Sequence, residues 1–255
     1  MCFIRFSGYN LKYLAEKLES YEEFEKARKL GFSYFQGYFF SKPERIHIKE
    51  IGSAKINLVN LLAEVNQKTT TPKKLEKIIR RDVGLAYKLL RYVNSSYFYR
   101  LHKIESVAHA ITFLGDIEIR RYLILVLISE LSTDKPEELV RLAIVRAKMS
   151  ELLAEEGPFR DKRDEIFLLG LFSLLDAMLD TTMEYICERL SLSDDLKNSL
   201  VHNTGAYAPF LRAVISYEKV DKAGCRAALQ EIGLPAGQLH ETYVEALHFA
   251  ESVFG

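Results

Sequence analysis

Residues 82–121 read DVGLAYKLLRYVNSSYFYRLHKIESVAHAITFLGDIEIRR, and this stretch decides the fold of the chain. Three helix starts are visible in it, because Asp82, Ser106 and Asp116 each carry a short side chain whose oxygen can cap a first helical turn. Gly115 lies where a left-handed residue can end the second helix before the third begins. Apolar residues recur three or four apart after the caps, which predicts amphipathic helices.

The helical period continues through the rest of the chain from residue 53 onward. Thr71 followed by Pro72 is a strong helix start. The run 166–178 is nearly all apolar and predicts one central buried helix. No strand-like alternation competes with this period, so residues 53–255 predict an all-α, multi-helix bundle.

Residues 1–47 have a different pattern. The short run 11–15 and the aromatic segment 34–40 resemble strands, and between them Ser20 caps a helix that Gly31 ends. Strand, helix, strand is a βαβ unit. We therefore divide the chain into an α/β unit at 1–47, a linker at 48–52 and a helical domain at 53–255. So small a unit buries little surface, so its apolar residues, Leu14, Leu30 and Phe39 among them, are expected to pack on the helical domain or on a second copy of the chain.

Composition excludes several classes of protein. The 35 Lys and Arg balance the 35 Asp and Glu, whereas nucleic-acid-binding proteins typically carry a basic excess or stripe. The pairs at 80–81 and 120–121 are interpreted as solvated helix faces. The longest apolar run, 122–128, is far shorter than the roughly 20 residues of a membrane span, and no signal peptide is evident. We expect a cytoplasmic protein that binds neither nucleic acid nor membrane.

The opening stretch resembles the HDOD family, the HD-related output domain of bacterial signalling proteins. The resemblance rests on residues with consistent gaps, and Val83 departs from the Pro usual after the Asp. The matching residues are Asp82, Leu89, Leu90, Arg91, Val93, Asn94, Ser95, Ile104, Ser106, Ala110, Ile111, Leu114, Gly115, Ile119 and Arg120. The resemblance implies an all-α fold and regulation through protein contacts.

Residues 1–47 resemble the tail of an EAL domain, the (β/α) barrel that hydrolyses cyclic di-GMP. The motifs are AEKLE at 15–19 and GFSYFQGYFFSKP at 31–43. By that resemblance Glu16 and Gln36 match a late catalytic Glu and Gln. The Glu-Ala-Leu tripeptide and the Asp-Asp pair are absent, and a barrel needs all its strands to close. We expect a truncated or degenerate remnant that neither binds nor hydrolyses cyclic di-GMP.

True HD phosphohydrolases bind metal through a His and an adjacent His-Asp pair, but none of the six histidines here precedes an Asp. The matching slot is 174–176, where Leu175 replaces the metal His and Asp176 remains. We interpret Asp176 as a hydrogen-bonded structural carboxylate. The sequence therefore predicts no catalytic residue, no metal, no cofactor and no enzymatic activity.

The loop 94–103 is the predicted interaction surface, because loops on rigid scaffolds often carry recognition residues. Tyr97, Tyr99 and Arg100 are the candidate contacts, since Tyr and Arg are enriched in interface hot spots. Phe98 has no polar end and is expected to point inward.

Together these patterns predict a non-enzymatic bacterial signal-transduction protein, in or near cyclic di-GMP signalling. It would act through protein–protein contacts of its HDOD domain, with an unidentified partner protein or as a homodimer. Two alternatives stay open. One is an HD-type phosphohydrolase with substituted ligands, which bound metal at Asp176 would favour. The other is the C-terminal fragment of an EAL phosphodiesterase, which an upstream coding segment with Glu-Ala-Leu would favour.

Overall fold

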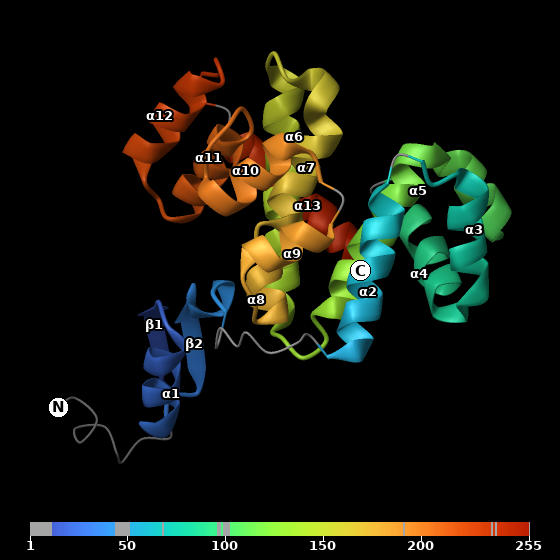
Figure 1. Ribbon diagram of the computed structural model, residues 1–255. Helices are drawn as coiled ribbons and strands as arrows, with labels where there is room; N and C mark the ends of the chain where they lie inside the picture. The colour runs from blue at the N-terminus through green and yellow to red at the C-terminus, as the bar shows by residue number, and fades with distance from the viewer. Residues whose placement is uncertain are drawn as a thin grey trace.

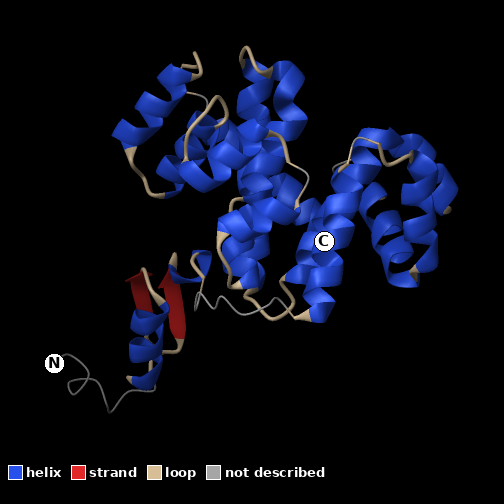
Figure 2. Cartoon of the chain, in the orientation of Figure 1, coloured by secondary structure: helices blue, strands red, loops and turns tan. Residues whose placement is uncertain are grey.

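The computed structural model describes residues 12–43, 52–67, 69–95, 98, 103–190, 192–235, 237 and 239–254. Within them the chain is mainly helical, with a two-stranded sheet near the N-terminus, which confirms the predicted fold class (Figures 1 and 2). The elements are β1 (Leu14–Leu18), α1 (Tyr21–Lys29), β2 (Tyr34–Gly37), the 3₁₀ turn η2 (Phe39–Ser41), α2 (Ser53–Asn66), α3 (Pro72–Arg81), α4 (Val83–Val93), α5 (Val107–Leu131), α6 (Glu137–Glu156), the 3₁₀ turn η3 (Arg160–Lys162), α7 (Arg163–Phe172), α8 (Leu175–Leu179), α9 (Met183–Arg189), α10 (Asp194–His202), α11 (Ala208–Glu218), α12 (Lys222–Glu231) and α13 (Leu239–Phe254).

The N-terminal elements form the predicted βαβ unit, in which β1 and β2 pair in parallel. The strand bounds differ from the prediction, because β1 begins at Leu14 and the aromatic segment turns into η2 after Gly37. A Cβ on Gly37 would lie 2.1 Å from the Leu18 carbonyl oxygen, so only glycine permits this approach of the strands. Phe24 stacks on Phe39 at 4.7 Å to form the small core of the unit.

The C-terminal end of the βαβ unit contacts the helical domain. The Tyr38 hydroxyl donates a hydrogen bond to the Glu218 carbonyl oxygen, and Phe40 packs against the cores of both parts. This is packing of the kind expected from the sequence. Leu14 and Leu30, however, are 45% and 63% exposed, so the helical domain does not cover these side chains, and their burial against a second copy of the chain stays a prediction.

Two of the three predicted helix starts of the opening stretch are confirmed by hydrogen bonds, whereas no hydrogen bond among the described residues shows Asp116 as a cap. Asp82 Oδ1 accepts from the amides of Gly84 (2.7 Å) and Leu85, and Ser106 Oγ accepts from the amide of His109. Gly115 has a φ of 72° and a ψ of −179°, which breaks α5 between its two halves. Each of these signals acts within a few residues, and each was visible in the sequence.

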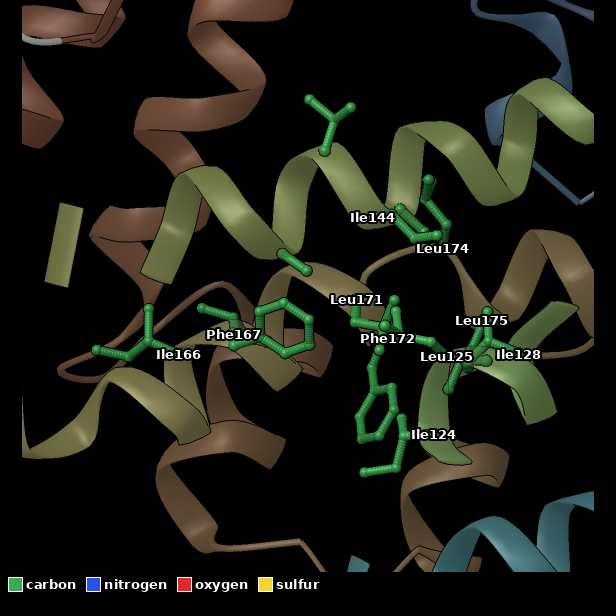
Figure 3. Packing of buried hydrophobic residues seen from close by; sticks show 14 of the residues in the cluster. Ile124, Leu125, Ile128, Ile144, Ile166, Phe167, Leu171, Phe172, Leu174 and Leu175 are labelled. Carbon is green, nitrogen blue, oxygen red and sulfur yellow. The ribbon is translucent and has the colours of Figure 1, made fainter. Parts of the chain in front are cut away.

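Helix α6 is the centre of the larger core. It packs along α7, α13 and α11, while α2, α3 and α4 gather around α5 (Figure 1). The predicted single helix at 166–178 is wrong, because α7 ends at Phe172 and α8 begins at Leu175. The Ser173 hydroxyl donates to the Gly170 carbonyl oxygen at 2.7 Å and so competes with the helical pattern there. Both pieces remain in the core (Figure 3).

Candidate functional site

Asn94 closes the base of the predicted interaction loop. Its side-chain amide donates to the carbonyl oxygens of Leu90 (2.7 Å) and Ile104 (2.8 Å), and its Oδ1 accepts from the Ile104 amide (2.9 Å). The half-buried side chain of Asn94 thereby joins the two ends of this loop, which lie ten residues apart in the sequence. The Asn of the family-like motif is thus a positioning residue for this loop.

Phe98 anchors the loop on its inner side, as predicted. Its ring meets Tyr92 edge-on at 5.0 Å and Phe113 at 6.0 Å, and it packs against the main core. Tyr97, Tyr99 and Arg100 lie outside the described residues, so their assignment as contacts stays a prediction.

Glu16 and Gln36 lie on adjacent strands of the small sheet. Ala15 pairs with Phe35, and each is followed by one of these two polar residues, both of them exposed. Within the described part of the chain, neither side chain makes a hydrogen bond or an ion pair. Glu16 and Gln36, the two positions matched to catalytic residues, thus lie near each other on an open two-stranded sheet. Among the described residues, they belong to no cluster of acidic side chains that could hold a metal ion.

Leu175 lies inside the core, 1% exposed, with Leu125 and Ile128 of α5 (Figure 3). Asp176 is half-buried, and its Oδ1 accepts a hydrogen bond from the Ala177 amide at 2.8 Å. Burial raises the pKa of the Asp176 carboxyl above its ordinary value, although the Ala177 amide and the charge of Arg146 act in the opposite direction. An apolar side chain therefore fills the slot matched to the metal His.

A buried ion pair that the sequence did not suggest lies close to this slot. Arg146 on α6 binds Glu218 on α11 through two contacts, Nε to Oε1 at 2.8 Å and Nη2 to Oε2 at 2.7 Å. The two side chains are only 7% and 5% exposed. Arg146 also donates to the Ser173 hydroxyl at the break between α7 and α8. No local pattern could reveal a pair separated by 72 positions.

The interpretation of 120–121 as a solvated face is wrong. Arg120 donates to the carbonyl oxygens of Val65, Gln67 and Thr70, where α2 leads to α3. Arg121 is buried, and its guanidinium lies 2.6 Å from Glu151 and 2.9 Å from Asp164. Burial opposes the charge on Arg121, but the surrounding carboxylates outweigh it and raise its pKa. Arg80 and Arg81 are exposed, as predicted.

A cavity of about 750 Å³ opens where the βαβ unit meets the helical domain. We call it the junction cavity; its walls come from the N-terminal unit and from α6, α11, α12 and α13. Its lining includes Tyr38, Phe40, Arg141, Tyr217, Arg226 and Tyr243. No pattern in the sequence indicated this cavity, because its walls are distant in the chain.

Possible metal ligands do not converge among the described residues, where no group of three or more His, Cys, Asp or Glu side chains could hold an ion. In the same residues, every helix is too short or too polar to cross a membrane.

Residues 54–191 match the sequence profile of the HDOD domain. The chain belongs to the HDOD domain family. The HDOD match includes Asn94 with its hydrogen bonds, Arg121 with its ion pairs, and Leu175. It leaves out residues 1–47 and helices α10–α13.

Two curated relatives span nearly all of the HDOD chain. It is 35% identical to Cyclic di-GMP phosphodiesterase CdgJ of Vibrio cholerae serotype O1 over 246 residues, which cover 96% of this chain and 57% of that protein. It is 32% identical to the uncharacterized protein YuxH of Bacillus subtilis (strain 168), covering 95% of this chain and 59% of YuxH. The chain therefore spans a little under three-fifths of the length of these relatives.

Two solved structures share the HDOD chain's fold. A candidate signal transduction protein of Marinobacter aquaeolei VT8 aligns with a TM-score of 0.53 and 16% identity, over 84% of this chain and 62% of that one. A candidate metal-dependent phosphohydrolase of Shewanella amazonensis SB2B aligns with a TM-score of 0.50 and 12% identity, over 82% and 93%. At these identities the likeness concerns the fold alone.

Proposed function

We propose that this HDOD chain is a non-enzymatic regulatory protein that acts through protein–protein contacts, in or near cyclic di-GMP signalling. One observation carries the non-enzymatic part: Leu175 occupies the slot matched to the metal His and is buried in the core. A hydrolytic metal needs several N or O ligands and an open position for water. A leucine supplies no ligand, and its side chain here is buried in the apolar core.

The charges around Asp176 support the same proposal. The cation that acts on this carboxylate is Arg146, which is itself held by Glu218 and Ser173. The positive charge of Arg146 lies near this carboxylate and disfavours a second cation beside it. Arg146 and Glu218 thus stabilise the packing of α6 on α11 in a place where a phosphohydrolase would hold metal.

The link to cyclic di-GMP rests on the relative named as a phosphodiesterase and on the EAL-like motifs of residues 15–19 and 31–43. The described βαβ unit has two strands, whereas a barrel closes only with its full set. Glu16 and Gln36 alone cannot assemble a hydrolytic site, and we propose that they are relics in this chain.

Two assays of the purified chain test this proposal. Elemental analysis should find no stoichiometric transition metal, and incubation with cyclic di-GMP should release no more product than a mock preparation. Metal bound near Asp176 and lost in Asp176→Ala would overturn the non-enzymatic reading in favour of a phosphohydrolase with substituted ligands.

Capture of partner proteins tests the second part of the proposal, that the chain acts through protein–protein contacts. Wild type and a Tyr99→Ala, Arg100→Ala double variant should differ in the proteins they retain, since removing an exposed hot-spot anchor typically costs about 1–2 kcal/mol or more of binding. A double variant that melts like wild type and keeps every partner would show that the loop is not the contact surface.

A second candidate function has its own support. The chain is 35% identical to a protein named as a cyclic di-GMP phosphodiesterase but spans 57% of it, so these residues can be the C-terminal part of such an enzyme. In a longer chain that includes a Glu-Ala-Leu segment, Glu16→Gln should then abolish hydrolysis without changing partner capture. Hydrolysis by the longer chain that Glu16→Gln leaves intact would exclude this role for Glu16.

A further inference from the structure

The junction cavity has the size and lining of a small-molecule site. Its volume of about 750 Å³ lies within the range of ordinary ligand pockets, about 300–1,000 Å³. Leu142, Val145 and Leu247 contribute apolar side chains to its lining. Tyr38 and Phe40 close it from the side of the βαβ unit, so a molecule bound there would touch both parts of the chain.

Aromatic rings form one wall of the cavity. The rings of Tyr217 on α11 and Tyr243 on α13 lie 5.3 Å apart at 50°, and both side chains are half-buried. The Tyr217 hydroxyl is fixed by a hydrogen bond with His240 Nδ1 at 3.2 Å. Rings held in place and partly open to a cavity favour a planar aromatic ligand, because stacking on such rings contributes about 1–3 kcal/mol per base.

Positive charge gathers at the rim. Lys222 and Arg226 lie one turn apart on α12, both exposed, and neither makes an ion pair with any described side chain. Arg141 on α6 lines the same cavity. Of the two acids in the lining, Glu218 is neutralised by Arg146, so Lys222 and Arg226 stand against the single carboxylate of Glu138. The rim is therefore complementary to an anion, and guanidinium groups suit phosphate in particular.

We propose that the junction cavity binds a nucleotide, with its base against Tyr217 and Tyr243 and its phosphate near Lys222 and Arg226. A nucleotide in this cavity is compatible with a regulatory chain and with a hydrolytic one. Because Tyr38 also lines the cavity and binds the Glu218 carbonyl oxygen, a bound nucleotide would strengthen the attachment of the βαβ unit to the helical domain.

Equilibrium binding to the full chain tests the proposal with four probes: GMP, AMP, inorganic phosphate and dodecanoate. The mononucleotides should bind more tightly than phosphate, which lacks a base, and more tightly than dodecanoate, which has an apolar chain in place of a ring. The double variant Lys222→Glu, Arg226→Glu should weaken nucleotide binding about tenfold or more, because it replaces attraction by repulsion at the rim. Lys219→Glu, an exposed neighbour outside the lining, is the matched control and should bind like wild type.

Melting curves of the variants keep the test interpretable, and exposed positions of this kind should melt like wild type. A Tyr243→Leu variant that loses nucleotide affinity while gaining affinity for dodecanoate would support the stacking role. Tighter binding of dodecanoate than of either nucleotide by wild type would overturn the proposal in favour of an apolar anion. Absence of nucleotide binding, or equal affinity in the double variant and wild type, would overturn it outright.

Discussion

Removing one partner of the buried Arg146–Glu218 pair should be among the most damaging single changes in this protein. In Glu218→Gln the guanidinium of Arg146 stays buried, 7% exposed, but loses the opposite charge that it meets through two contacts of 2.7 and 2.8 Å. The shape of the side chain is nearly unchanged, so the loss concerns charge rather than packing. An uncompensated buried charge is costly because the interior cannot solvate it as water does.

The expected loss is about 3–5 kcal/mol of unfolding free energy, the range found when one partner of a buried pair is removed. For a domain of this size, about 2–4 °C of melting temperature is lost per kcal/mol, so the melting point should fall by about 6–20 °C. Replacing both partners by apolar residues of similar volume, Arg146→Met with Glu218→Leu, should recover most of this loss, because no buried charge remains.

Urea denaturation, monitored by far-ultraviolet circular dichroism, measures these differences in unfolding free energy directly. The matched control is Glu231→Gln at the Arg212–Glu231 pair, whose side chains are 33% and 52% exposed. An exposed pair contributes about 0–1 kcal/mol, so this variant should unfold close to wild type. If Glu218→Gln costs no more than Glu231→Gln, the pair is hydrated in solution and the reasoning from burial is wrong.

Three further predictions concern single residues. Asn94→Ala removes three hydrogen bonds at the loop base and should cost about 2–3 kcal/mol in urea denaturation, at about 1 kcal/mol each; a loss below that of an ordinary surface change would mean that the clamp is not formed. Gly170→Ala places a Cβ 2.4 Å from the Arg146 carbonyl oxygen, which should separate α6 from α7 and lower the free energy of unfolding by about 1–3 kcal/mol. Gly157→Ala is the control and should melt like wild type, because the nearest atom to its added Cβ is 3.5 Å away. Equal melting temperatures of the two variants would contradict the close packing of α6 on α7. Burial raises the pKa of Asp176, so its ionisation destabilises the fold once the pH exceeds the ordinary value of 3.8, and Asp176→Asn should be more stable than wild type at neutral pH and lose that advantage below 3.8. A constant difference across this range would show that Asp176 does not titrate differently in the folded state.

The helices of the opening stretch could be predicted because their signals are local. A cap, the turn it closes and the glycine that ends it lie within a few residues, so Asp82, Ser106 and Gly115 specify their helix boundaries wherever the chain folds. The βαβ unit follows from the same kind of pattern, and the family resemblance could be read from residues in one stretch. The inward position of Phe98 was also predictable, since its side chain has no polar group to place in water.

The sequence alone therefore determined the fold class and the family, and it predicted that Leu175 stands where HD phosphohydrolases hold a metal His. Tertiary structure decided what the charged residues do. From the sequence, Arg120 and Arg121 were expected to lie on a solvated helix face. In the structure, Arg120 donates to three carbonyl oxygens of the α2–α3 connection, and Arg121 is buried among acids from α6 and α7. The junction cavity likewise exists only where α6, α11, α12 and α13 meet the βαβ unit. The physical reason is range: capping and periodicity act over three or four residues, whereas desolvation of a charge depends on which distant helices pack around it.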